Sequence, residues 1–248
     1  MKCFGVVLLT LLYSTLAREL PSSFSICKRN DPKLNECFSR SAEKALKILK
    51  EPLPEFGIPA VNPVKVEKIE VPASSSDNFR LRQKITNLEI HNLINSKVSH
   101  CDINFGEKDF NATINLENPL IELKGNYELD GKILVLQIQG EGTFQIILEK
   151  ISGVLRLSGL IIEKKGKKYL QVEKTFCKVT PMLAKIKFNN LFNGDQALGE
   201  SVNTLLNQNW KDIYEELSPT YEEVLAQFLE SIAKQIFSKV PFDNLFPL

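Results

Sequence analysis

The stretch IELKGNYELDGKI, residues Ile121–Ile133, decides the fold because its apolar side chains recur at every second position. A period of two predicts a β-strand with one buried face. Asp130-Gly131, followed by the apolar run Ile133–Ile138, predicts a hairpin turn at that dipeptide. The same period extends from Val64 to about Phe188, so this region is expected to form a long antiparallel meander.

Helical patterns flank the β region on both sides. Before it, apolar residues recur at steps of three and four from Leu34 to Leu49, and a proline-rich connector follows. After Gly194-Asp195, two apolar stripes predict about 45 residues of amphipathic helix, with Ser218-Pro219 as a kink or a new helix start. The stripes are wide, which suits a helix lying on the concave side of a strongly curved sheet. The predicted fold class is therefore α+β.

Composition excludes several classes of function. The chain has 248 residues, 43% of them hydrophobic, a formal net charge of +1 and two histidines. Nucleic-acid binding requires an excess of basic residues, which is absent. The sequence also lacks a G-x-S-x-G elbow, an H-E-x-x-H helix and a Walker loop. We therefore expect no enzyme activity, no cofactor and no metal site, and a lipid hydrolase would lack a nucleophile and base.

Residues 1–17 have the features of a secretory signal peptide. Lys2 precedes a mostly apolar run, and Thr15-Leu16-Ala17 places small residues at the −3 and −1 positions of a cleavage site before Arg18. No later stretch approaches the length of uncharged apolar sequence that a membrane span needs. The prediction is a secreted, extracellular protein without stable membrane insertion, whose mature domain spans residues 18–248.

Four cysteines remain after removal of the signal peptide, and an oxidising compartment favours disulfides. Cys27 and Cys37 are close in sequence and are expected to form one. Cys101 and Cys177 are a candidate second pair, although the sequence does not tell whether they meet. A separate modification is expected at Asn111, the first residue of the N-x-[ST] sequon Asn111-Ala112-Thr113, which the alternation places on the outer face.

Several motifs resemble those of the insect Takeout and juvenile hormone binding protein family. Residues Cys27–Cys37 match its N-terminal signature C-x-R-x-D-P-x-x-N-x-C. The segments Phe188–Asp195 and Asn203–Trp210 resemble its C-terminal stretch, and Gly125-Asn126-Tyr127 with Gly131 resembles its central hairpin. The hormone-binding branch has a second disulfide that reaches its C-terminal helix. Because no cysteine follows Cys177, the resemblance favours the Takeout-like branch and argues against specific binding of juvenile hormone.

The resemblance implies a single elongated domain in which a highly curved antiparallel sheet wraps a long C-terminal helix and encloses a hydrophobic tunnel. The expected function is a monomeric extracellular carrier of a small hydrophobic ligand, of terpenoid, quinone or fatty acyl type. Feeding and circadian physiology are the roles associated with the family. The alternative is an extracellular protein-interaction signal that engages a receptor and has a vestigial cavity.

The candidate tunnel wall combines apolar strand positions with the stripe of the C-terminal helix. Its members are Tyr127, Leu134, Leu136, Phe144, Ile146, Leu206, Trp210, Ile213, Leu217, Val224 and Phe228. A solid core is the competing interpretation for each of them. Polar groups that interrupt apolar strand faces would set ligand specificity, and the candidates are Tyr127, Gln137 and Gln145.

Overall fold

The computed structural model describes residues 18–71, 79–133 and 136–248, so the predicted signal peptide and Leu134 lie outside the described residues. Its helices and strands are α1 (Leu34–Ile48), β1 (Val64–Val71), β2 (Phe79–His91), η1 (Leu93–Asn95), β3 (Lys97–Phe105), β4 (Asp109–Ile133), β5 (Leu136–Lys164), β6 (Lys167–Thr180), β7 (Leu183–Phe188), η2 (Phe192–Gly194), α2 (Gln196–Gln208), α3 (Trp210–Phe237) and α4 (Phe242–Leu245).

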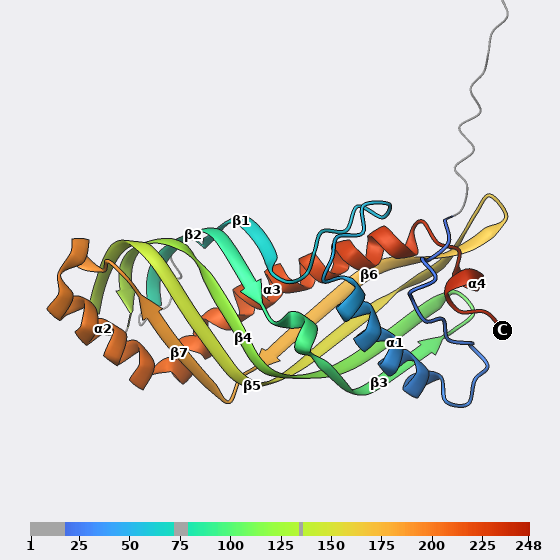
Figure 1. The fold of residues 1–248 in the computed structure, drawn as a ribbon, viewed down its shortest axis with the longest axis horizontal. Helices are drawn as coiled ribbons and strands as arrows, with labels where there is room; N and C mark the ends of the chain where they lie inside the picture. Colours follow the sequence, from blue (N-terminus) through green and yellow to red (C-terminus); the bar gives the residue numbers. More distant parts are fainter. Residues whose placement is uncertain (1–17, 72–78, 134–135) are drawn as a thin grey trace, which may run out of the picture.

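The strands form one seven-stranded antiparallel sheet that curves around α3 (Figure 1). Strands β4 and β5 are its spine, with 25 and 29 residues, several times the usual strand length. One half of this hairpin pairs with β2 and β7, and the other half pairs with β3 and β6. The predicted meander and the long helix in its concavity are confirmed.

Pro119 marks the point where β4 changes partner. Strand β3 pairs with β4 up to Glu117, and β2 pairs with it from Glu122 onward. Because neither strand reaches Pro119, its missing N–H removes no bond from these two ladders. The neighbouring Asn118 side chain is buried and donates to the carbonyl of Asn92 and the hydroxyl of Ser96, which fixes the crossover between β2 and β3.

The predicted turn at Asp130-Gly131 is wrong. Pairing between β4 and β5 continues through Gly131, opposite Ile138, to Ile133, opposite Leu136. Gly131 is instead required by the close approach of β2, since a Cβ atom there would lie 1.9 Å from the carbonyl oxygen of Arg80. Its φ of 146° is also one that other residues rarely adopt.

The backbone N–H and carbonyl groups at the free edge of β7 form hydrogen bonds with asparagine side chains instead of with another strand. Asn207 of α2 accepts from the backbone N–H of Ile186 at 2.9 Å and donates to its carbonyl at 2.7 Å. Asn203, one helical turn earlier, makes the same pair of bonds with Phe188, both at 2.8 Å. Each amide thus replaces the donor and acceptor of a neighbouring strand, which explains the Asn203…Asn207 spacing.

Helices α1 and α3 complete two other edges in a similar way. In α1, Asn35 accepts from the N–H of Ile103 at 3.1 Å, and Glu43 accepts from that of Val98 at 2.7 Å. Both acceptors face β3, so Asn35 of the cysteine motif anchors α1 to the sheet. At the end of β6, α3 provides partners for both backbone groups of Val179, as described below for the cavity.

The four cysteines of the described residues form one disulfide. Cys27 and Cys37 are bonded, as predicted, and their linkage secures the segment before α1. Cys101 and Cys177 are buried free thiols, so the candidate second disulfide is not formed. The register explains this, because Ile114 and Leu155 lie between them in one row across β3, β4, β5 and β6. Three strand spacings correspond to about 14 Å along the sheet, too far for a disulfide.

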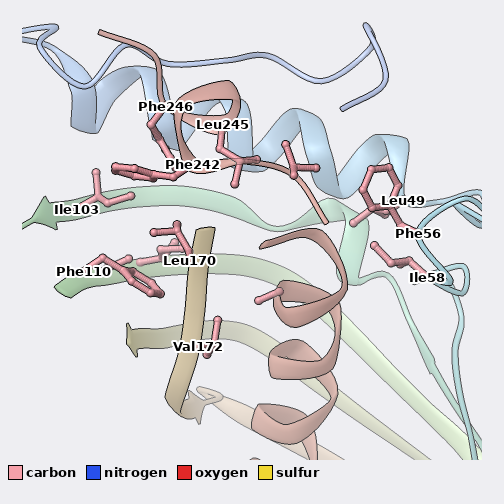
Figure 2. Close-up of a cluster of buried hydrophobic side chains, with 14 of the residues drawn as sticks. Leu49, Phe56, Ile58, Ile103, Phe110, Leu170, Val172, Phe242, Leu245 and Phe246 are labelled. Carbon is pink, nitrogen blue, oxygen red and sulfur yellow. The ribbon is translucent and has the colours of Figure 1, made fainter. Parts of the chain in front are cut away.

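The two ends of the sheet are filled differently. Figure 2 shows the solid end, where Phe242, Leu245 and Phe246 pack against Ile103, Phe110 and Leu170 of the sheet. The segment before α1 is bound to the C-terminal residues here: the N–H of Arg29 donates to the carbonyl of Pro247, and its guanidinium pairs with Asp243 at 2.7 Å. A second cluster, around Ile138, Phe144 and Leu206, lies toward the opposite end under α2 and α3.

The break in the C-terminal helical region falls at Asn209 and not at Ser218-Pro219. Asn209 separates α2 from α3, and α3 continues through Pro219 to Phe237. Asp195 begins α2 by accepting from the N–H of Leu198 at 3.0 Å, as a helix cap should. The position of the break lets α2 cover β7 while α3 runs along the concave face (Figure 1).

We predict that Asn207→Leu destabilises the protein by about 1–3 kcal/mol, because it leaves the N–H and carbonyl of Ile186 without partners. Asn207→Asp retains the acceptor but places a carboxylate oxygen against the carbonyl oxygens of Ile186 and Asn203, so it should destabilise the protein as well. Gln208→Leu, at an exposed position of α2, is the matched control. Urea unfolding measures all three variants, and equal midpoints for Asn207→Leu and Gln208→Leu would contradict the edge-capping role.

Removal of the disulfide by Cys27→Ser together with Cys37→Ser should lower the free energy of unfolding by about 2–4 kcal/mol, since the loop that it closes becomes free in the unfolded chain. Chemical unfolding of the oxidised protein and the double variant gives this difference. Alkylation and peptide mapping without reductant should find Cys101 and Cys177 as thiols and Cys27 joined to Cys37. Detection of free thiol at Cys27 would disprove the linkage.

Candidate functional site

An internal cavity of about 210 Å³ lies between the concave face of the sheet and the helices α2 and α3. On the helical side its wall extends from Leu206 to Phe228, and on α3 alone the fifteen residue steps from Ile213 to Phe228 correspond to about 22 Å. The space is therefore long and narrow. The sheet contributes apolar side chains from β1, β2, β4, β5 and β7, among them Val64, Leu81, Ile85, Leu129, Ile138, Phe144 and Ile186.

The wall is almost entirely aliphatic or aromatic, which makes the cavity a favourable place for an apolar molecule. Its polar members are few and gather on one side, where α3 faces β2 and the end of β6. They are Gln83, Tyr214, Ser218, Tyr221 and Glu222. Four of these five belong to one face of α3, at spacings of three and four residues.

Tyr214 and Glu222 attach α3 to the end of β6. The hydroxyl of Tyr214 donates to the carbonyl of Val179 at 2.8 Å, and Glu222 accepts from the N–H of Val179 at 3.0 Å. Glu222 also pairs with Lys178, whose Nζ lies 3.2 Å from Oε1. Burial raises the pKa of Tyr214, and the Glu222 carboxylate adds to that increase, so the hydroxyl remains a donor.

Tyr221 and Gln83 connect α3 to β2 across the cavity wall. The Tyr221 hydroxyl donates to Oε1 of Gln83 at 2.8 Å, and burial raises the pKa of Tyr221 to about 12. Gln83 is 5% exposed and Ser218 is 4% exposed. Among the described residues, Nε2 of Gln83 and Oγ of Ser218 are two of the four buried side-chain nitrogen or oxygen atoms that have no hydrogen-bond partner.

Most of the candidate wall residues lie at the cavity. The structure places seven of them there: Phe144, Ile146, Leu206, Ile213, Leu217, Val224 and Phe228. Leu134 lies outside the described residues, as does the side chain of Leu136. Ligand contact by the seven stays a prediction, since the structure contains only the protein.

Two aromatic candidates lie elsewhere. Tyr127 is buried against the ring of Phe188, and its hydroxyl donates to the carbonyl of Asn189 at 2.7 Å. It therefore binds the end of β7 and the residue after it, and it does not line the cavity. Trp210 is the first residue of α3 and packs against Ile121, Leu148 and Ile151 in a separate cluster. The helix break at Asn209 turns Trp210 toward this cluster, which a continuous stripe did not predict.

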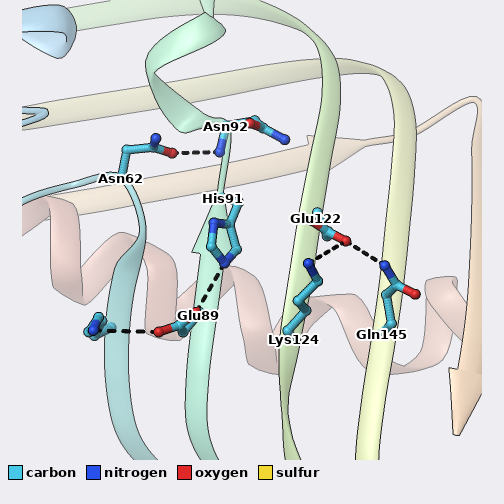
Figure 3. A network of polar contacts seen from close by, with 8 residues as sticks. Asn62, Glu89, His91, Asn92, Glu122, Lys124 and Gln145 are labelled. Carbon is cyan, nitrogen blue, oxygen red and sulfur yellow. Dashed lines mark hydrogen bonds and ion pairs between the residues drawn. The ribbon is translucent and has the colours of Figure 1, made fainter.

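Gln137 and Gln145 are on the outer face of the sheet and do not reach the cavity. Gln137 is exposed, and Gln145 alternates with the cavity residues Phe144 and Ile146. Figure 3 shows Gln145 donating to Glu122, which also pairs with Lys124 at 2.9 Å. His91, on a neighbouring strand, contacts Glu89 at 3.1 Å (Figure 3). These groups form a surface network and not a specificity site.

The polar residues that do line the cavity were not among the candidates from the sequence, although their positions in the sequence pattern mark them. Gln83 occupies the apolar register of β2, between Leu81 and Ile85. Ser218 and Glu222 interrupt the apolar stripe of α3 beside Leu217 and Val224. A polar side chain in the inward register of an otherwise apolar element is the pattern that identifies all three.

Other site predictions have the following outcomes. Asn111 is exposed on the outer face between buried Phe110 and Ala112, and its glycosylation stays a prediction.

Burial raises the pKa of the Cys101 and Cys177 thiols to about 11, which makes them poor nucleophiles at neutral pH. The described residues contain no group of three or more His, Cys, Asp or Glu side chains suited to a metal ion. No helix within them is long and apolar enough to cross a membrane.

A curved antiparallel sheet that wraps a long helix, with an apolar cavity between the two, is the architecture of a class of hydrophobic-ligand carriers. The model of one such family, the haemolymph juvenile hormone binding proteins, matches residues 5–247, so the chain belongs to this family. Among solved structures, Takeout 1 of Epiphyas postvittana superposes with a TM-score of 0.78 over 90% of this chain and 99% of its own, at 23% identity, which supports the shared fold.

Two curated relatives are the circadian clock-controlled protein daywake of Drosophila melanogaster and of Drosophila yakuba. They are 24% and 23% identical to this chain, over 91% of it and 88% of their own length. The resemblance to the Takeout and juvenile hormone binding family is therefore confirmed over nearly the whole chain.

We predict that Leu217→Trp lowers the affinity for a fluorescent apolar dye at least tenfold, because the larger ring occupies the cavity, while overpacking costs about 1–3 kcal/mol of stability. Trp210→Ala is the control: its side chain is half-buried, so it should cost less than the ~3–5 kcal/mol of a fully buried Trp, and it should leave dye affinity unchanged, since Trp210 lies outside the wall. Dye titration and thermal unfolding measure the two properties. Unchanged dye binding by Leu217→Trp would mean that apolar molecules bind somewhere else.

Proposed function

We propose that the protein is a secreted carrier that holds one small, slim, hydrophobic molecule in the cavity beneath α3. The observation that carries this proposal is the apolar wall, which continues over both the sheet and the helix. At about 210 Å³ the cavity is smaller than the 300–1,000 Å³ that is typical of drug-sized ligands, which favours a narrow or linear molecule.

Burial of the ligand provides enough free energy for transport. Removing roughly 400 Å² of apolar ligand surface from water contributes about 10 kcal/mol at ~25 cal/mol per Å². The loss of translational and rotational freedom and the ordering of side chains offset several kcal/mol of this gain. The remaining affinity is about micromolar to nanomolar, which allows both loading and release.

Binding without catalysis is the proposed activity because the polar groups of the wall are not arranged for chemistry. Ser218, the one hydroxyl there outside the two tyrosines, has no base as a hydrogen-bond partner. Glu222 is already paired with Lys178 and bonded to the backbone of Val179. A serine nucleophile needs a base within hydrogen-bond reach, and the cavity does not supply one to Ser218.

Extracellular location is supported by the Cys27–Cys37 disulfide, by the sequence of the predicted signal peptide and by the haemolymph setting named for the family. We propose a monomer that travels in extracellular fluid. The similarity to daywake supports a link to circadian physiology as part of the same proposal.

Native mass spectrometry of the protein, purified from the fluid of the cells that naturally produce it, tests the carrier function. The expected result is a one-to-one complex with an apolar molecule, which organic extraction removes and which restores thermal stability when it is added back. Protein that carries no such molecule, and that neither binds apolar dyes nor gains stability with any lipid fraction, would instead support the receptor-engaging alternative.

A further inference from the structure

Two polar atoms without a hydrogen-bond partner belong to residues that line the cavity, Nε2 of Gln83 on β2 and Oγ of Ser218 on α3. We propose that the ligand bears a neutral carbonyl oxygen, which accepts hydrogen bonds from Nε2 of Gln83 and from the hydroxyl of Ser218. This inference rests on the proposed carrier function and specifies its ligand class, an apolar ketone, ester or similar carbonyl compound. Buried polar atoms are normally satisfied, so atoms left without partners in a binding cavity indicate the polar group that they receive.

The orientation of the Gln83 amide leaves a donor, and not an acceptor, for the ligand. The Tyr221 hydroxyl donates its proton to Oε1 of Gln83 at 2.8 Å, which leaves Nε2 unpaired. Reversing the amide would remove the acceptor that this proton requires. Gln83 is in the inward register of β2, between the cavity residues Leu81 and Ile85, so its free N–H groups are at the cavity wall.

Ser218 behaves differently from Ser39, Ser201 and Ser231 of the helices. Ser39 and Ser201 each donate to the backbone carbonyl four residues earlier, and Ser231 donates to the one three residues earlier, which is a usual way for a helical hydroxyl to satisfy itself. The hydroxyl of Ser218 makes no such bond, although the side chain is only 4% exposed. Ser218 precedes Tyr221 by three residues and is therefore on the same face of α3 as the partner of Gln83.

The charge beside Ser218 selects a neutral ligand group over a carboxylate. Glu222 follows Ser218 by one helical turn, lines the cavity and is 8% exposed. Its ion-pair partner Lys178 has a side chain that is 47% exposed, whereas the side chain of Glu222 is 10% exposed, so water screens the cation more than the carboxylate. An ionised fatty acid placed at Ser218 would be repelled by Glu222 and lose its hydration, whereas a ketone or ester would not.

Three probes of equal chain length separate these effects in a dye-displacement assay at neutral pH. They are a medium-chain methyl ketone, the terminal alkene in which a methylene group replaces the carbonyl oxygen, and the carboxylic acid. The intact protein should bind the ketone about tenfold more tightly than the alkene, the effect of one or two neutral hydrogen bonds. The acid should bind more weakly than the ketone.

Two variants remove the donors without leaving new partnerless atoms. Ser218→Ala removes the hydroxyl, and the double variant Gln83→Met, Tyr221→Phe replaces a hydrogen-bonded pair by apolar groups of similar shape. Both should lose most of the preference for the ketone, which is measured as the ratio of its affinity to that of the alkene in the same variant. Ser218→Ala should also leave the empty protein at least as stable as before, since it deletes an unsatisfied group. Ser201→Ala, at an exposed helical serine, is the control that should retain the preference.

The outcomes distinguish this inference from the carrier function. If the intact protein binds ketone and alkene equally, the carrier function stands and the carbonyl site is overturned. Tighter binding of the acid than of the ketone would overturn the selection by Glu222. If no probe displaces the dye, the carrier function fails and the inference fails with it. A ketone preference that persists in both variants would place the carbonyl at another part of the wall and would also overturn the assignment.

Discussion

The backbone N–H and carbonyl groups at the free edges of the curved sheet are the constraint on which the rest of the structure depends. Strands β4 and β5 pair along nearly their whole length, but β3, β6 and β7 expose edges that another chain could join. The helices resolve this problem with side chains: Asn35 and Glu43 bind β3, Asn203 and Asn207 bind β7, and Tyr214 and Glu222 bind the end of β6. Directional bonds of this kind set the height and the register of each helix on the sheet.

The cavity follows from that mode of attachment. Helix α3 is held to β6 at Val179 and to β2 at Gln83 by polar bonds of fixed length, so it does not settle fully into the concave face. At the end that contains α4, aromatic rings fill the concavity and the interior is solid. Toward the other end an apolar space remains between the sheet and the side chains of α2 and α3. The solid aromatic core and the apolar cavity thus occupy different parts of one continuous sheet.

Sequence patterns predicted the sheet, the long helix and the N-terminal disulfide because each depends on local spacing. They failed where tertiary contact decides the result. Gly131 has the appearance of a turn residue but is a glycine because Arg80 approaches it, and Trp210 leaves the helical stripe because the chain bends at Asn209. Local spacing does not tell whether Cys101 and Cys177 meet, because the order of the strands sets the distance between them. Gln83 was recognisable as a polar residue in an inward register, but its partner Tyr221 is 138 positions away in sequence.

The attachment of the segment that begins at Arg18 and of the C-terminal residues to the solid half of the molecule has a practical consequence for engineering. Arg18 donates its backbone N–H to the carbonyl of Lys239, and Arg29 binds Pro247, so the described N-terminal segment and the C-terminus lie together (Figure 1). A reporter domain or a surface linker joined to the C-terminus would extend from this half and leave the helices around the cavity unobstructed. The same proximity would allow the two ends to be joined by a short peptide, with new termini opened at the β5–β6 hairpin between Lys164 and Lys167, where the backbone is exposed.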